Sequence, residues 1–191
     1  GYQDGDEIII TNNSRNVTFR NCFITGNVSH YYKTLNIATG CDSIFITGNN
    51  FDCDYTGTVI YSFDGSGLVD IRNNIISGSS SRGIFSGNTK DLRIENNVIK
   101  NASIAIGFES YRIDTAIIRN NSISNIDIGI QLGFNNGGYF RIEGNRITHV
   151  SDKGIYIPTC VYGNTYSFDI INNYIQTEGA GITTGIQIED N

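Results

Sequence analysis

The sequence predicts an all-β fold: a single-stranded, right-handed parallel β-helix with three strands per coil, about seven to eight coils and an internal asparagine ladder. A short phrase returns seven times, made of an apolar strand, a polar doublet that ends in Asn or its substitute, and a second apolar strand. The second doublet residue is Cys22, Asn49, Asn74, Asn97, Asn121, Asn145 and Asn173, with spacings of 27, 25, 23, 24, 24 and 28 residues. A repeat of this length is typical of a solenoid.

The segments of each phrase read as strands. Apolar and polar residues alternate, so that Val69 and Ile71 are expected to point inward while Asp70 and Arg72 point outward, and no stretch keeps a helical period. A coil of about 24 residues is too short for a strand and a crossover helix, so equivalent strands must stack in parallel. Such connections are nearly always right-handed. In chain order the phrases occupy residues 17–24, 44–51, 69–76, 92–99, 116–123, 140–147 and 168–175.

A further strand follows each phrase, which gives a coil three strands and a roughly triangular cross-section. These strands are expected at residues 35–37, 60–61, 83–85, 105–108, 129–132, 154–157 and 185–188. Coils stacked about 4.8 Å apart bring equivalent residues into columns. The Asn column is therefore expected to form a ladder of hydrogen-bonded amides, with Cys22 buried at the equivalent position.

With these phrases the chain resembles the pectate-lyase-like right-handed β-helix superfamily, which includes phage tailspikes and other polysaccharide-active proteins. The resemblance extends from Glu7 to Glu189. In that superfamily the amide ladder lies between the second and third strands, so the resemblance makes the Gly-Ile strand the first strand of each coil. Its outward column is then Asn36, Tyr61, Phe85, Gly107, Gln131, Tyr156 and Gln187. The resemblance implies a fold, whereas the activity must be argued from the site.

Composition bounds the remaining expectations. A chain of 191 residues can bury a continuous core, so we expect one β-helix domain over residues 1–191. The net charge of −6 and the absence of a basic run argue against a nucleic-acid partner, and no apolar stretch is long enough to cross a membrane. Ile8-Ile9-Ile10 reads as a strand without a preceding capping helix. The chain is therefore expected to be a fragment of a longer protein, or to be capped by neighbouring chains.

The four cysteines are expected to be free thiols. Cys41 and Cys160 lie in loops about five coils apart, roughly 24 Å at strand spacing, which is far beyond the reach of a disulfide. No Cys-x-x-Cys or comparable spacing is present, so the sequence indicates neither a metal site nor a cofactor.

A shallow groove is expected along the first-strand column, between long aromatic loops on one side and polar turns on the other. Aromatic rings stack on sugar rings, and planar amides form hydrogen bonds with hydroxyl groups. An extended polysaccharide that runs along the solenoid axis fits such a groove. The alternative is that the Tyr and Phe side chains pack on their own coils. Candidate substrate-binding residues are Tyr61, Phe85, Gln131, Tyr156, Gln187, Tyr111 and Arg112.

Two pairs of carboxylates are candidates for acid catalysis. Retaining glycosidases hold two carboxyl groups about 5 to 5.5 Å apart and inverting enzymes about 6.5 to 9.5 Å, which correspond to one and two coils. Asp127 and Asp152 lie one coil apart, six and seven residues after their ladder positions, and Asp64 and Glu109 lie in loops two coils apart. His149, beside the first pair, could orient a group or exchange a proton. The alternative is that all of these are solvated charges.

Three classes of function remain open. The leading expectation is a phage tailspike-like or appendage-like depolymerase, a glycoside hydrolase acting on a bacterial surface polysaccharide. The second is a non-catalytic glycan- or receptor-binding module, and the third is a structural solenoid subunit. A polysaccharide lyase is less favoured, because the first-strand column lacks stacked Asp residues for Ca²⁺ and because Arg82, Lys100 and Lys153 lie on separate coils. We expect an extracellular or virion-surface location and association into a homotrimer.

Overall fold

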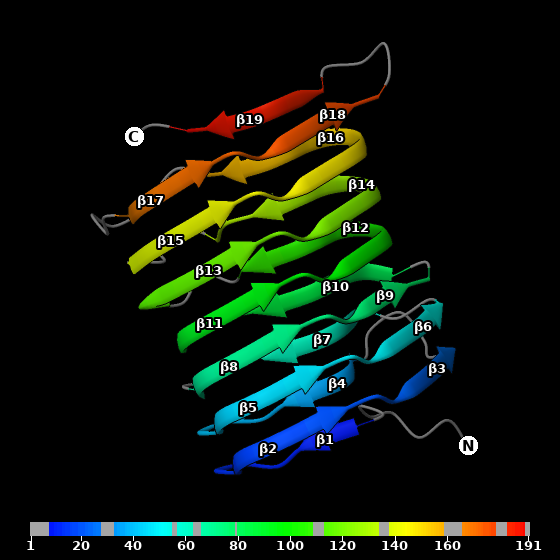
Figure 1. Cartoon of the computed structure of the whole chain (residues 1–191), viewed down its shortest axis with the longest axis vertical. Helices are drawn as coiled ribbons and strands as arrows, with labels where there is room; N and C mark the ends of the chain where they lie inside the picture. Colours follow the sequence, from blue (N-terminus) through cyan, green and yellow to red (C-terminus); the bar gives the residue numbers. More distant parts are fainter. Residues whose placement is uncertain are drawn as a thin grey trace.

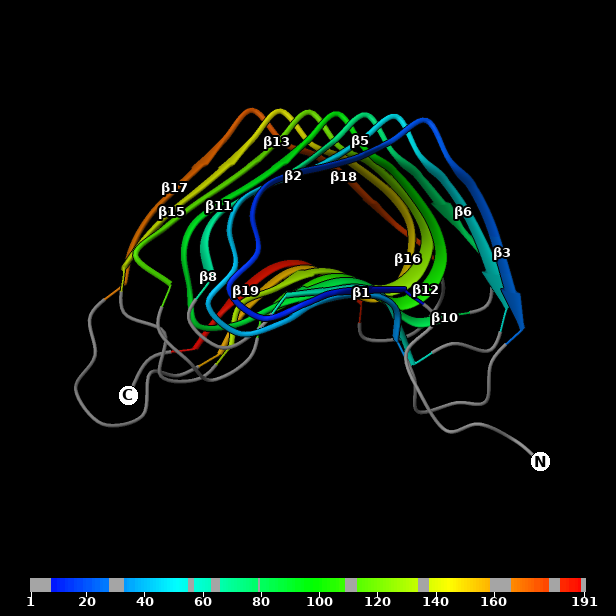
Figure 2. The same ribbon diagram turned by 90° about the horizontal axis from the view of Figure 1, so that it is seen from below.

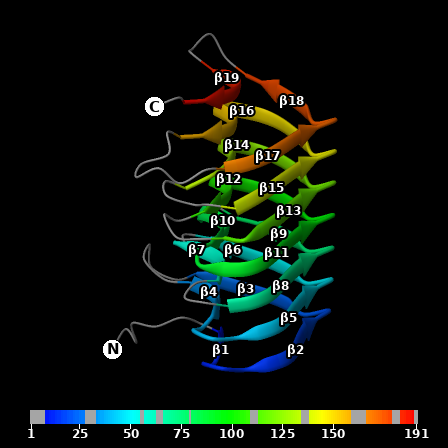
Figure 3. The same cartoon turned by 90° about the vertical axis from the view of Figure 1, so that its left-hand side faces the viewer.

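The computed structural model describes residues 8–27, 33–54, 57–62, 66–78, 80–108, 113–133, 138–158, 166–178 and 183–189. These residues form strands, turns and bends, and none of them is helical. The coils stack along one axis (Figures 1 and 3), and the strands pair in parallel from one coil to the next. The predicted all-β, right-handed parallel β-solenoid is confirmed.

A seven-stranded sheet carries the first strand of every repeated phrase. Its order, β17-β15-β13-β11-β8-β5-β2, places consecutive repeats side by side. The chain makes about six turns in all, slightly fewer than the seven to eight expected. The strands are β2 (Arg15–Arg20), β5 (Asp42–Thr47), β8 (Ser66–Arg72), β11 (Thr89–Glu95), β13 (Thr115–Arg119), β15 (Gly138–Glu143) and β17 (Tyr166–Ile171).

A twelve-stranded sheet forms the other two sides of the cross-section, as seen along the axis in Figure 2. One side contains the strands that follow the doublet, namely β3 (Phe23–Asn27), β6 (Asn50–Asp54), β9 (Ile75–Ser77) and β18 (Tyr174–Thr177). The other side contains the first strands of the coils, namely β1 (Ile8–Ile10), β4 (Lys33–Ile37), β7 (Thr58–Ser62), β10 (Ser80–Ser86) and β19 (Thr184–Ile188).

Three long strands cross from one side of this sheet to the other: β12 (Val98–Phe108), β14 (Ser122–Gln131) and β16 (Arg146–Ile157). The sequence predicted two separate strands in each of these coils. The corner is instead made by single residues with left-handed backbone, Asn101, Asn125 and His149, whose φ angles are 58°, 55° and 55°. Asn tolerates this conformation better than most residues do, so one residue can bend the strand without a loop.

The asparagine ladder is confirmed between the seven-stranded sheet and the strands that follow it. Asn49, Asn74, Asn97, Asn121 and Asn145 are each about 1% exposed. The first residue of every doublet has positive φ and is Asn or Gly, so each doublet is one left-handed residue followed by one ladder residue. Cys22 was expected to be buried but is only half-buried, because it lies in the first of these coils and contacts the ladder from one side.

The core consists of stacked apolar columns inside the coils. Ile46, Ile71, Ile94, Ile118 and Ile142 pair in register and are fully buried. On the first-strand side of the solenoid, a column of small residues that includes Gly129 and Gly154 faces the interior. A Cβ at Gly154 would lie 2.5 Å from Ile175 Cγ2, so this glycine allows two walls of the solenoid to approach closely. Cys41 and Cys53 are buried and Cys22 is half-buried, and none of these three thiols forms a disulfide. Cys160 lies outside the described residues.

Candidate functional site

Three carboxylates on the outer face of the seven-stranded sheet form ion pairs with arginines of the same sheet. Asp70 and Glu95 point outward, yet their side chains are only 2% and 8% exposed because arginines cover them. These two carboxylates therefore have their partners within the sheet. The ion pairs are Arg72–Asp70, Arg119–Glu95 at 3.2 Å and Arg141–Glu143 at 2.8 Å.

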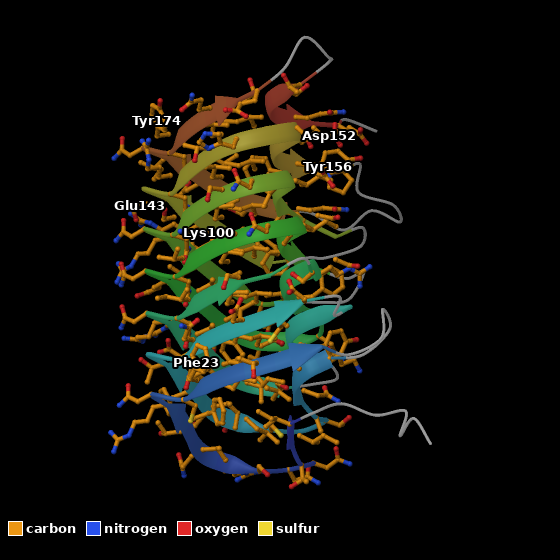
Figure 4. The ribbon with its side chains drawn as sticks, turned by 90° about the vertical axis from the view of Figure 1, so that its right-hand side faces the viewer. Phe23, Lys100, Glu143, Asp152, Tyr156 and Tyr174 are labelled. Atoms are coloured by element: carbon orange, nitrogen blue, oxygen red, sulfur yellow. The ribbon has the colours of Figure 1, made fainter. Side chains whose placement is uncertain are left out.

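The face formed by β3, β6, β9 and β18 has isolated apolar groups rather than a continuous aromatic column. Phe23 and Tyr174 are 67% and 51% exposed, but they lie near opposite ends of the stack (Figure 4). Ile75 is also exposed, and Arg146 lies over the Tyr174 ring at 4.6 Å. The column that joins Phe23 to Tyr174 gives no aromatic platform on which a sugar chain could stack, because its other members are Asn50, Ile75, Val98, Ser122 and Arg146.

The first-strand face contains the outward column that the sequence predicted. Equivalent residues of consecutive coils pair in one line, and Tyr61 lies in this line. Alternating residues of a strand point to the same side, so this line is one surface parallel to the solenoid axis. The paired residues are Asn36, Tyr61, Phe85, Gly107, Gln131, Tyr156 and Gln187.

Cations cover the aromatic rings at the N-terminal half of this column. The Arg82 guanidinium carbon lies 4.0 Å from the centroid of the Phe85 ring, and Lys33 Nζ lies 4.2 Å from that of Tyr61. Phe85 also leans over Gly107, where a Cβ would come within 2.5 Å of the ring. Phe85 is therefore only 6% exposed, and a ligand here would meet the Arg82 guanidinium in place of the ring face.

Tyr156 is the half-exposed aromatic residue at the C-terminal half of the column. Lys153 Nζ lies 5.0 Å from its ring centroid and is held by both carboxylate oxygens of Asp152 at 2.9 Å. Figure 4 shows Asp152 and Tyr156 at the same edge of the stack, opposite the edge from which Glu143 projects. Asp152 thus neutralises the cation that lies nearest to the Tyr156 ring.

The hydroxyl group of Tyr156 contacts a carboxylate of the next coil. It donates a hydrogen bond to Glu189 Oε1 at 3.1 Å, and Gln187 Nε2 donates to the same oxygen at 2.9 Å. Burial, the hydrogen bond to Glu189 and the charges of Glu189 and Asp152 raise the pKa of Tyr156, in that order of importance. The phenol therefore stays protonated at neutral pH and acts as a fixed donor.

Asp127 and Asp152 lie on adjacent coils, and each contacts a group other than its expected partner. The pairing of β14 with β16 shifts in register between Ile126 and Ile128, so that Asp127 faces two residues of the next coil. Ser151 is one of these two, and its Oγ lies 2.6 Å from Asp127 Oδ1. In this structure the two carboxylates are thus separately hydrogen-bonded, Asp127 to Ser151 and Asp152 to Lys153.

His149 lies at the corner of β16, two residues before Ser151. Its Nε2 is 3.2 Å from Glu178 Oε1, an ion pair when the imidazole is protonated, and both side chains are about half exposed. Four further candidates, Asp64, Glu109, Tyr111 and Arg112, lie outside the described residues. The structure therefore assembles the substrate-binding candidates of the strands, and the loop candidates remain predictions.

Residues 58–191 match the family described as the right-handed β-helix region. The chain belongs to the right-handed β-helix family. Searches of curated proteins and of solved structures found no match to this β-helix. A β-helix domain is compatible with proteins that bind or degrade polysaccharides.

Two features of this β-helix were missed by sequence reasoning. Glu189 was not among the candidates, although it follows Gln187 by two residues and so belongs to the same outward side of the strand. The covering of Phe85 by Arg82 had no sequence signal beyond a three-residue separation.

Among the described residues, no group of three His, Cys, Asp or Glu side chains could hold a metal ion, and no helix could span a membrane.

Proposed function

We propose that this β-helix binds an extended bacterial surface polysaccharide along its first-strand face. The observation that carries the proposal is the continuous register of outward residues from Asn36 to Gln187, all of which except Gly107 carry an aromatic or amide side chain. A polymer laid along the axis would meet a new outward residue about every 4.8 Å. The amides of Gln131 and Gln187 supply donors and acceptors for hydroxyl groups, and Tyr156 supplies a ring for stacking.

A comparison of charged residues on the seven-stranded sheet and on the first-strand face supports the choice of the first-strand face. On the seven-stranded sheet Asp70, Glu95 and Glu143 are each paired with an arginine. Arg82 of the first-strand face instead contacts the Phe85 ring and no carboxylate among the residues that the structure describes. A guanidinium with free donors can bind hydroxyl or anionic groups of a glycan. The first-strand face thus combines unused hydrogen-bonding groups with aromatic surface.

Binding of purified chain to a panel of bacterial capsular and lipopolysaccharide-derived glycans tests the proposal. We expect Tyr156→Ala to weaken binding about tenfold through lost stacking and a lost hydroxyl donor, while the melting midpoint changes little. Arg93→Ala, on the seven-stranded sheet, is the control and should bind as the wild type does. Equal loss of affinity in both variants would place the site elsewhere.

Hydrolysis of the bound polysaccharide, as in a tailspike-like depolymerase, is a second candidate function. The observation that favours it is the position of Asp127 and Asp152 on adjacent coils at the edge of this face. Coil spacing is close to the separation of the two carboxyl groups in retaining glycosidases. Release of reducing ends from the polysaccharide that binds would distinguish a hydrolase from a binding module, and an unsaturated product would indicate a lyase.

A further inference from the structure

Glu189 is a carboxylate held in a fixed position on the first-strand face. Its backbone N–H donates to the carbonyl of Ile157 in the preceding coil at 3.0 Å, which fixes the main chain just after β19. Its Oε1 accepts hydrogen bonds from Tyr156 and Gln187 at 3.1 and 2.9 Å. Three contacts with two coils therefore fix the position of this half-buried side chain.

The second carboxylate oxygen is available to a ligand. An ionised carboxylate can accept about four hydrogen bonds, two at each oxygen. Both sites of Oε1 are used, and Oε2 contacts no donor among the described residues. Hydrogen bonds to an ionised acceptor are roughly twice as strong as those between neutral groups. Glu189 Oε2 is thus a strong and pre-oriented acceptor for about two further donors.

The charges around Tyr156 leave this acceptor unbalanced. Asp152 and Lys153 neutralise each other through two contacts at 2.9 Å. No cation of the described part of the chain pairs with Glu189, whose partners are the neutral phenol and amide. Asp152, Lys153 and Glu189 together therefore carry one net negative charge, which repels anionic groups and attracts hydrogen-bond donors.

We propose that Glu189 determines sugar specificity at the C-terminal end of the face, where its Oε2 accepts hydrogen bonds from two adjacent hydroxyl groups of a neutral sugar that rests on Tyr156. A sugar that presents a carboxylate at this point is disfavoured, because it offers no donor and meets a like charge. The inference rests on the proposed polysaccharide binding and adds the class of sugar that this part of the face selects.

The test uses the whole chain and polymers that differ in one group. Dextran, mannan and galactan serve as neutral probes, and alginate is compared before and after chemical reduction of its carboxyl groups. We expect the wild type to bind neutral polymers and to prefer carboxyl-reduced alginate. Glu189→Gln should weaken binding of the neutral polymer about tenfold and bring the affinity ratio of reduced to acidic alginate close to one.

Two further variants separate positioning from charge. Tyr156→Phe keeps the ring but removes the hydroxyl group that orients Glu189, so its loss of affinity should be smaller and should still favour the reduced polymer. Glu143→Gln makes the same chemical change on the opposite edge of the stack and should leave binding unchanged. Wild-type binding that Glu189→Gln does not alter would overturn this inference and leave the proposed function standing. Failure of the wild type to bind any of these polymers would overturn this inference, and failure to bind the capsular and lipopolysaccharide-derived panel as well would overturn the proposed function.

Discussion

The side-chain amide of Asn97 joins three successive coils. Its Nδ2 donates to Asn121 Oδ1 at 3.1 Å in the following coil and to the carbonyl of Ile71 at 2.9 Å in the preceding one. Its Oδ1 accepts from both the backbone and the side chain of Asn74 at 3.0 Å. Because all of these groups are buried, the ladder satisfies polar atoms that would otherwise face an apolar core.

Replacing Asn97 with Leu should therefore destabilise the chain by about 1 to 3 kcal/mol, the cost of buried polar groups left without partners. Leu keeps a comparable side-chain size, so the effect reports the lost hydrogen bonds more than a cavity. Thermal or denaturant unfolding measures it. Asn50→Leu is a matched control, because Asn50 points outward on β6 and is only half-buried. An unchanged melting midpoint in Asn97→Leu would contradict the role given to the ladder.

Gly154→Ala should destabilise the core by about 1 to 3 kcal/mol through overpacking. The added methyl group would lie 2.5 Å from both Ile175 Cγ2 and the carbonyl oxygen of Gly185, and the latter atom belongs to a paired strand that cannot easily move. Gly185→Ala is the control in the same column, because no atom lies within 4 Å of its added Cβ. Equal stability of the two variants would show that the close approach of the walls does not limit residue size.

The repeat, the ladder and the outward register could be predicted from sequence because each is a periodic property. Once Asn74, Asn97 and Asn121 define the period, strand alternation decides which residues point outward. The corners could not be predicted in the same way. Asn101, Asn125 and His149 bend continuous strands through a left-handed backbone conformation. Because the third of these residues is His, the three corners share no residue type that would mark them in the sequence. A period also cannot reveal that Cys22 lies at the margin of the ladder.

The features of the site that could not be predicted from sequence are the side-chain contacts between residues of different coils or of one strand. Asp127 and Asp152 were placed on adjacent coils correctly, and the extra residue before Asp152 was visible in the spacing. The effect of this extra residue on the contacts of Asp127 was not visible, because only the strand register shows that Ser151 reaches Asp127. The same holds for Phe85, whose ring is outward in register and yet covered by Arg82.

Titration of Tyr156 provides a test of its contact with Glu189. Because burial and the neighbouring carboxylates raise the pKa of Tyr156 above its usual value, this phenol should ionise at a higher pH than an ordinary tyrosine does. The ultraviolet difference spectrum between wild type and Tyr156→Phe, recorded against pH, isolates its signal. Glu189→Gln should move the transition toward lower pH, and an unmoved transition would show that Glu189 does not act on the phenol.

The same shift has a defined effect on stability. An unfolded tyrosine loses its proton near pH 10, and folded Tyr156 holds its proton to higher pH. The contribution of this group to stability is therefore fully present below about pH 10 and is lost as the pH rises through the folded pKa. We expect alkaline unfolding in this window to respond to Tyr156→Phe, whereas stability curves at neutral pH should show no pH dependence from this residue.

The hydrolase candidate makes the sharpest chemical prediction, because it requires specific oxygens to ionise or exchange a proton. Asp152→Asn keeps the shape of the side chain but removes the ionisable carboxyl group, so cleavage of a bound polysaccharide should fall by at least ~100-fold if Asp152 is the acid or nucleophile. Asp127→Asn tests the second member of the pair, and Asp91→Asn on the seven-stranded sheet controls for charge loss.

Binding must be measured alongside cleavage, because Asp152 also holds Lys153 beside Tyr156 and its replacement could release that cation. Loss of cleavage with retained affinity would assign chemistry to Asp152, whereas parallel loss of both would assign it to binding. Full activity in Asp127→Asn and Asp152→Asn would transfer the prediction to Asp64 and Glu109. Full activity in all four variants would mean that the acids come from another subunit, since grooves between parallel solenoids can combine residues of two chains.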